Sequence, residues 1–243
     1  MLSHTMVGAV TPGLHIRNEE YWIHYVLRDI LKVFGRAVVI DTGSTDQTTA
    51  IVKKTFDMYG TPGECILVEE DMGTDAIKIG QCSTRLRGMI KTPWMLLVDG
   101  DEIWRTTQLK NFLDALEGLR VEDTEVGLIK ARNIIEHNDV FVEREGFSAD
   151  RLFSPVVKWS KRNDYPFQSH DLEDRIDRGK SFYFLGDVFF WHVRHIIRSS
   201  NEQVAYFRQE KRDYFPWDGQ FEDLPEDWLG DVDPAFLNPY LKI

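Results

Sequence analysis

The amino-acid sequence predicts an α/β fold with a mostly parallel central sheet flanked by helices. Short apolar runs alternate with amphipathic helical patterns over the first hundred residues, the order expected of right-handed strand–helix–strand units. The run Trp94–Val98 is apolar at five consecutive positions, as in a strand that is buried on both faces. Two of the expected strands end in a carboxylate, Asp41 and Asp99. Ligands of such sheets bind at this carboxyl edge, so we expect a site there.

Length and composition favour one large domain over residues 1–243. Hydrophobic residues make up 42% of the chain, enough for a sizeable core. The net charge of −11 argues against a broad nucleic-acid or anionic-membrane surface. The two cysteines are not at a metal-binding spacing, residues 1–13 lack a signal-peptide pattern and no apolar run is long enough to span a membrane. We therefore expect a cytoplasmic protein without a transmembrane segment.

The first half of the chain is expected to hold three strand–helix units and a fourth strand. Met6–Val10 and Leu14–Arg17 are both candidates for the first strand, and we favour the residues that lead into Asn18, a suitable helix N-cap. The apolar stripe that follows ends at Gly35. The remaining elements are a strand at 37–40, a helix with a Ser44–Gln47 capping box that ends near Gly60, a strand at 65–68, a helix over about 76–91 and the strand at 94–98.

After residue 106 the pattern changes to a mixture of helices and strands. We expect a helix at 108–119, strands at 125–131, 140–142, 151–153, 156–159 and 181–193, and a surface helix at 200–212. Four prolines between residues 215 and 243 indicate an irregular tail that is wrapped on the surface. The second half is therefore expected to be a mixed α+β extension of the parallel sheet.

The strand at 94–98 runs directly into an acidic loop. Asp99, Asp101 and Glu102 fall within four positions, and Gly100 between the aspartates would let the backbone turn so that both face one site. Hard carboxylate oxygens at this spacing suit Mg²⁺ or Mn²⁺, which commonly hold a phosphate as well. The alternative is an acidic turn after a strand.

The order and spacing of these motifs resemble the family 2 glycosyltransferases of the GT-A fold. The resemblance rests on His15–Glu20, Val38–Asp46 and Leu97–Glu102 in the first half, and on Arg151–Phe153, Trp159, His170–Asp171 and His192 in the second. It covers about residues 14 to 195. It implies a nucleotide-sugar-binding half at about 14–105, an acceptor and catalytic half at about 106–197, and a C-terminal helix with an irregular tail at about 198–243.

The resemblance also implies a reaction and its cofactors. A sugar would move with inversion from a UDP-, GDP- or dTDP-sugar to a hydroxyl of a glycan, lipid-linked or protein acceptor, with Mn²⁺ or Mg²⁺ as cofactor. Asp101 would bind the metal, Asp99 would be shared between the metal and the ribose, and a neutral His192 could complete the metal shell. His192 could equally be a hydrogen-bonded residue at a strand end.

Other residues would hold the nucleotide and its diphosphate. Asp41 would contact the base or ribose, although it could instead open an Asx turn. His15 and Arg17 would border the base pocket, whereas Asn18 and Glu19 would tie down the first loop. Guanidinium groups bind phosphate at two points, so Arg194 and Arg198 are candidates for the diphosphate, and Arg85 is a further one.

Inverting transfer needs a base that takes the proton of the acceptor hydroxyl. Asp171 follows His170 as the acidic residue of this family follows its histidine, and Asp174 of the Glu173–Asp174 pair is the alternative.

Two other functions share the fold. A nucleotidyltransferase would normally show a glycine-rich basic loop after its first strand, which His15–Glu20 lacks. A protein that binds a nucleotide sugar or carbohydrate without turnover is the second.

Overall fold

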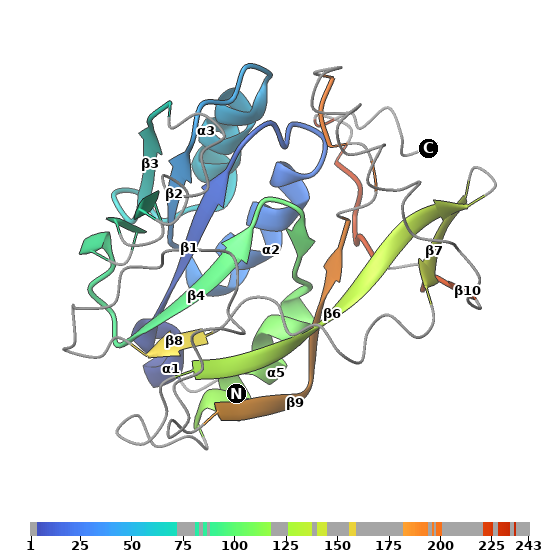
Figure 1. Ribbon diagram of the computed structural model, residues 1–243. Coiled ribbons are helices and arrows are strands. Elements are labelled where there is room, and N and C mark those ends of the chain that lie inside the picture. Colours follow the sequence, from blue (N-terminus) through green and yellow to red (C-terminus); the bar gives the residue numbers. More distant parts are fainter. Residues whose placement is uncertain are drawn as a thin grey trace.

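The computed structural model describes residues 4–71, 81–82, 85–86, 88–117, 126–137, 140–144, 156–158, 182–193, 196, 198–200, 221–225, 228–233 and 236. Within these ranges a mixed sheet forms the centre of the molecule and helices pack against it (Figure 1). The predicted α/β class is thereby confirmed. No helix among these residues is both long enough and apolar enough to cross a bilayer.

Four parallel strands form the part of the sheet nearest the N-terminus. Strand β1 (Val10–Ile16) lies between β4 (Trp94–Asp99) and β2 (Ala37–Asp41), and β3 (Cys65–Glu69) lies outside β2. All three neighbouring pairs are parallel. Strands β2, β3 and β4 fall where apolar runs of the sequence indicate them, and β2 and β4 are buried at nearly every position, as continuous apolar runs predict.

The first strand differs from the expectation in two respects. Met6–Val10 is not a strand, because helix α1 covers His4–Ala9, and β1 runs unbroken through Pro12 and Gly13. Pro12 lies before Gly13, the first residue that β1 pairs with β2, which limits the consequence of its missing N–H. Gly13 is needed for space, because a Cβ there would lie 2.9 Å from Leu86 Cδ2.

Helices α2 (Ile23–Phe34), α3 (Thr48–Tyr59) and α5 (Thr106–Glu117) cover one side of the sheet (Figure 1). Helix α2 ends as expected at Gly35, whose φ of 65° is the left-handed conformation that glycine tolerates. The expected helix starts were wrong. Asn18 is not the cap of α2, because that helix begins at Ile23. At the start of α3, the N–H of Thr48 donates to Asp46 Oδ1 at 2.9 Å in place of the expected Ser44–Gln47 capping box.

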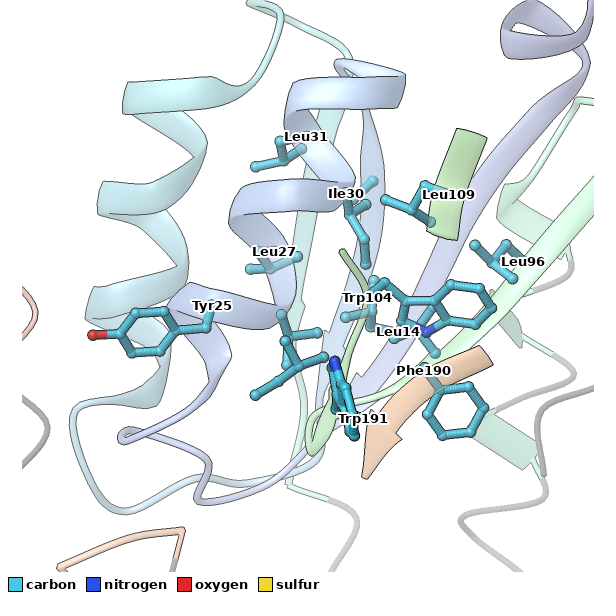
Figure 2. Close-up of a cluster of buried hydrophobic side chains, with 14 of the residues drawn as sticks. Leu14, Tyr25, Leu27, Ile30, Leu31, Leu96, Trp104, Leu109, Phe190 and Trp191 are labelled. Atoms are coloured by element: carbon cyan, nitrogen blue, oxygen red, sulfur yellow. The ribbon is translucent and has the colours of Figure 1, made fainter. Parts of the chain in front are cut away.

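The strands pack on both of their faces, as their alternating side chains show. Val39 of β2 and Leu96 of β4 lie in a large apolar cluster with α2 and α5. The side chains of Val38 and Met95 point the other way, into a second cluster. The second cluster is completed by side chains from the segment where the sequence predicts a helix, at positions 82, 86 and 90. The described residues 81–82, 85–86 and 88–89 of this segment are helical. The larger cluster, which contains Trp104 and Phe190, is drawn in Figure 2.

The second half continues the sheet with mainly antiparallel strands. They are β5 (Glu102–Ile103), β6 (Val126–His137), β7 (Val140–Arg144), β8 (Val156–Lys158), β9 (Phe182–His192) and β10 (Phe221–Asp223). The strand order is β10-β7-β6-β8-β4-β1-β2-β3, while β9 pairs with β5 and with β6. The tail thus supplies a strand, β10, that the sequence does not indicate. The strand expected at 151–153 and the helix expected at 200–212 lie outside the described residues, apart from residue 200.

Candidate functional site

Three strands bring polar residues to one edge of the sheet. In the register of β1, His15 pairs with both Ile40 of β2 and Asp99 of β4, and the next residue, Ile16, pairs with Asp41. The carboxyl ends of β2 and β4 are therefore separated only by β1. The expectation that Asp41 and Asp99 end at the same edge is confirmed.

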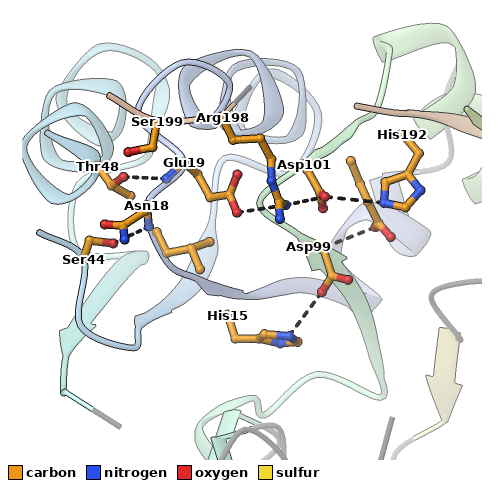
Figure 3. A network of polar contacts seen from close by, with 12 residues as sticks. His15, Asn18, Glu19, Ser44, Thr48, Asp99, Asp101, His192, Arg198 and Ser199 are labelled. Atoms are coloured by element: carbon orange, nitrogen blue, oxygen red, sulfur yellow. Dashed lines mark hydrogen bonds and ion pairs between the residues drawn. The ribbon is translucent and has the colours of Figure 1, made fainter. Parts of the chain in front are cut away.

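The loop after β1 is tied to the loop after β2. Asn18 has a φ of 52°, unusual for a residue with a side chain, and its amide oxygen accepts a hydrogen bond of 2.8 Å from the N–H of Thr45. The N–H of Asn18 donates to Ser44 Oγ at 2.8 Å and that of Glu19 donates to Thr48 Oγ1 at 2.7 Å. These bonds fix the position of the Glu19 side chain at the sheet edge (Figure 3).

Asp41 forms an Asx turn at the end of β2. Its Oδ1 accepts hydrogen bonds from the N–H of Gly43 at 3.0 Å and of Ser44 at 2.8 Å, and its Oδ2 accepts one from the Ser44 hydroxyl. The side chain is buried. Its oxygens are thus used to shape the loop, which is the structural role that the sequence left open for this residue. A contact with the nucleoside stays a prediction.

The two aspartates of the acidic loop point in different directions. The side chain of Asp99 is 45% exposed, and its Oδ1 lies 3.3 Å from His15 Nε2. Asp101 is buried in the same loop. Gly100 leaves room for Glu19 between them, since a Cβ at Gly100 would lie 2.6 Å from Glu19 Cγ. Glu19 can therefore reach the site only because the middle residue of the motif has no side chain.

Asp101 belongs to a buried cluster of charged groups. Its Oδ2 is in ion-pair contact with Arg198 Nη1 and lies 3.5 Å from His192 Nε2 (Figure 3). The same Arg198 Nη1 lies 2.9 Å from Glu19 Oε1. One guanidinium group is thus shared by two buried carboxylates. Burial raises the pKa of Glu19 well above its ordinary value; Arg198 lowers that pKa again in part, whereas the negative charge of Asp101 raises it further.

Strand β9, which is distant in sequence from the acidic loop, brings His192 to this cluster. Strand β9 pairs His192 with Glu102 of β5, and the N–H of Val193 donates to the carbonyl of Asp101 at 2.9 Å. This pairing holds the imidazole of His192 beside the carboxylate of Asp101. The structure thus places His192 beside the acidic loop, and its role as a metal ligand stays a prediction.

Residues 198–200 are anchored to the loops after β1 and β2. The N–H of Tyr21 donates to the carbonyl of Arg198 at 3.1 Å, and Ser199 Oγ donates to Asp46 Oδ2 at 2.6 Å. The N–H of Ser200 donates to Glu20 Oε1. These three bonds hold the backbone on either side of the Arg198 side chain that reaches Asp101.

The other candidate residues are placed as follows. Arg85 forms an ion pair with Glu70, whose N–H donates to the carbonyl of Asp41 at 2.9 Å, so Arg85 stands near the same edge. Arg17 is half-buried in the loop after β1. The candidate bases Asp171 and Asp174, and the candidate diphosphate ligand Arg194, lie outside the described residues.

The donor atoms around Asp101 suit a hard divalent cation. Two ligands of one octahedral ion, each about 2.1 Å from it, lie about 3 Å apart, which is close to the 3.5 Å between Asp101 Oδ2 and His192 Nε2. Among the described residues no three His, Cys, Asp or Glu side chains gather closely enough to hold a metal. Asp101 and His192 would by themselves supply two ligands, and Mg²⁺ is commonly bound by one or two protein carboxylates together with substrate phosphates.

Comparison with known proteins supports the fold. No family model matches the chain. The chain is 27% identical over 183 residues to an uncharacterized protein of Methanocaldococcus jannaschii, a match that covers 74% of this chain and 76% of that protein. A mannosyltransferase of Pyrobaculum calidifontis, solved in complex with GDP-Man and Mn²⁺, is similar with a TM-score of 0.53 and 15% identity over 83% of this chain and 60% of that one.

A third similar protein is TarS of S. aureus (residues 1–349), with 22% identity and a TM-score of 0.42 over 51% of this chain and 36% of that one. The chain thus spans less than two thirds of either solved structure. The parallel order β4-β1-β2-β3, the flanking helices and the likeness to the mannosyltransferase show that the chain has an α/β fold of the GT-A kind.

Proposed function

We propose that the chain is a glycosyltransferase, similar to family 2, that moves a sugar from a nucleotide-diphosphate donor to an acceptor hydroxyl with inversion and with Mn²⁺ or Mg²⁺ as cofactor. The contact between Asp101 and His192, 3.5 Å apart at the carboxyl edge of the parallel sheet where Asp99 also ends its strand, carries this proposal. The similar fold of a mannosyltransferase that binds GDP-Man and Mn²⁺ supports it.

The donor would lie across the ends of β1, β2 and β4. His15 lies one residue before the end of β1 and Arg17 follows the strand, and both would border the nucleoside base. Asp41 would contact the base or ribose from the end of β2. Arg85 and Arg194 would contact the diphosphate through their guanidinium groups. We propose a UDP-, GDP- or dTDP-sugar as the donor.

Asp101 and His192 would hold the cation, and the exposed carboxylate of Asp99 would lie between it and the ribose. When bound, a divalent ion supplies positive charge to the leaving diphosphate. The small side-chain exposure of Asp101 and His192, 6% and 7%, means that few water molecules compete for their donor atoms.

The acceptor side needs a base. We propose that Asp171 accepts the proton of the acceptor hydroxyl as that oxygen attacks the anomeric carbon and the bond from this carbon to the diphosphate breaks. Asp174 is the alternative for the same proton. A glycan, a lipid-linked sugar or a protein side chain can each offer such a hydroxyl.

Asp101→Asn tests the proposal, because it keeps the shape of the side chain and removes its charge. We expect Mn²⁺-dependent binding of UDP or GDP, measured by calorimetry, to weaken at least tenfold, and transfer or slow hydrolysis of the sugar nucleotide to fall about 100-fold or more. The matched control is Asp114→Asn on the exposed face of α5, which should change neither. Wild-type activity in Asp101→Asn would refute the metal assignment.

A binding protein without turnover is a second candidate, and one observation favours it. Asp101 is already paired with Arg198, so the carboxylate has a counter-ion without any metal. A panel of UDP-, GDP- and dTDP-sugars with Mn²⁺ separates the two functions. An increase of the melting temperature without hydrolysis or transfer would indicate a binder.

A further inference from the structure

The acidic loop has a second polar contact, between His15 near the end of β1 and Asp99 at the end of β4. The two residues are partners in the register of these parallel strands, so their side chains lie on one face of the sheet, about 5 Å apart. His15 Nε2 lies 3.3 Å from Asp99 Oδ1, and this contact is separate from that between Asp101 and His192 (Figure 3). Asp99 is thus held from β1, the central strand of the parallel half.

The surroundings of the His15 ring favour a neutral imidazole with its proton on Nε2. His15 Nδ1 is buried and has no hydrogen-bond partner among the described residues. A proton on Nδ1 would therefore leave a buried N–H unpaired and turn the lone pair of Nε2 towards the carboxylate of Asp99. A proton on Nε2 avoids both costs. His15 is therefore assigned as the donor to Asp99 Oδ1.

This contact constrains a carboxylate that is otherwise open to solvent. The side chain of Asp99 is 45% exposed, whereas that of His15 is 19% exposed. An exposed side chain loses rotamer freedom when it binds a ligand, and this loss weakens binding. A donor fixed on a central strand removes part of the loss before the ligand arrives. The backbone of Asp99 is also held, because its N–H donates to Glu102 Oε2 at 3.2 Å.

The pair lies between the two ends of the proposed nucleotide site. The base would lie near Asp41 at the end of β2, and the diphosphate with its cation near Asp101. The ribose connects base and diphosphate, so it would lie between these points, where β1 and β4 bring His15 and Asp99 together. An ionised carboxylate in this place can accept hydrogen bonds from ribose hydroxyls.

We propose that His15 is a positioning residue that orients Asp99 towards the ribose of the nucleotide. This inference rests on the proposed function, which supplies the nucleotide and the contact of Asp99 with its ribose. The imidazole acts on the ligand through Asp99, a role that differs from bordering the base. The affinity gained from a ribose hydroxyl consequently depends on His15.

The test compares the affinity of the full chain for UDP and GDP with that for their 2′-deoxy and 3′-deoxy analogues, by calorimetry with Mn²⁺. Loss of the hydroxyl that Asp99 accepts should weaken binding to the wild type about tenfold. His15→Phe keeps a ring beside the base but lacks Nε2, and it should reduce this ratio to about threefold or less. His15→Gln returns an N–H donor and should restore most of the ratio.

His24→Phe is the matched control, because it makes the same substitution in α2, where the ring contacts Thr55 and Phe236. It should leave the ratio unchanged. His15→Ala takes the place of His15→Phe if that variant does not fold. A residue that only shapes the strand would weaken the binding of all nucleotides equally, so a wild-type ratio in the His15 variant that folds would overturn the inference.

A wild type that binds UDP or GDP without distinguishing either deoxy analogue would also overturn the inference and would leave the proposed function intact. The proposed function fails separately: it falls if the wild type with Mn²⁺ neither binds nor turns over any sugar nucleotide, and the inference then falls with it.

Discussion

Lowering the pH from 7 to 5 is expected to destabilise the protein through His24 in helix α2. The ring is 1% exposed and stacks on Phe236 with centroids 3.5 Å apart. Its Nδ1 lies 3.1 Å from Thr55 Oγ1, and this hydroxyl donates to the carbonyl of Ile51 at 2.8 Å. Since the hydroxyl proton is already used, Nδ1 must carry the proton of the neutral ring, and a second proton would go to Nε2.

Nε2 is buried and has no hydrogen-bond partner among the described residues. Burial, and next to it the positive charge of Arg28, lower the pKa of His24 from 6.5 to about 4. The unfolded chain therefore binds a proton at a higher pH than the folded one. Stability from this group is complete above pH 6.5 and is lost as the pH falls from 6.5 towards 4.

These values set the size of the effect. A pKa of 6.5 in the unfolded chain and about 4 in the folded one corresponds to about 2 kcal/mol lost between pH 7 and pH 5.

Chemical denaturation of the wild type and of His24→Gln at several pH values between 7 and 4.5 provides the measurement. The other titrating groups are common to both chains, so the difference in unfolding free energy isolates His24. The wild type should lose about 2 kcal/mol relative to the variant between pH 7 and pH 5. A difference that stays constant with pH would refute the reasoning about the buried Nε2.

Two further substitutions test the packing. Gly13→Ala should lower the free energy of unfolding in denaturant by about 1–3 kcal/mol, because its Cβ would lie 2.9 Å from Leu86 Cδ2. The control Gly88→Ala lies in a helical segment with nothing within 4 Å of the new Cβ, and it should raise the free energy of unfolding by up to about 1 kcal/mol. Equal effects of the two substitutions would contradict the close contact at Gly13. Arg28→Met should cost about 3–5 kcal/mol, because the buried guanidinium donates to the carbonyls of Leu229 and Asp231 and pairs with a buried carboxylate. Limited proteolysis with mass spectrometry should then find faster cleavage near Asp231, and an unchanged pattern would exclude this tether.

The parallel half of the fold could be predicted because its signals are local. Three apolar runs mark β2, β3 and β4, and the carboxylates at the ends of two of them mark the edge where sheets of this kind bind their ligands. The sequence left open whether His192 is a metal ligand or a hydrogen-bonded residue at a strand end, and its position beside Asp101 is compatible with either. The errors in this half, at Met6–Val10 and at the two helix starts, arose where several capping residues or short apolar runs lay close together in the sequence.

The arrangement of the acidic loop could not be read from the sequence. Asp99 and Asp101 have similar surroundings along the chain, yet one side chain is 45% exposed and the other 6%. The difference comes from Arg198 and Glu19, which reach Asp101 from remote segments. Gly100 was expected to shape a turn, and its main consequence is the space that it leaves for Glu19.

The anchors of residues 198–200 also bear on how the protein is made. Ser199 and Asp46 are separated by 153 positions, and Ser200 and Glu20 by 180. A ribosome delivers β1 to β4 long before it delivers Arg198, so a nascent chain has to tolerate the carboxylates of Glu19 and Asp101 without their shared guanidinium group. Completion of this corner must therefore be a late event in folding, after most of the polypeptide has been synthesised.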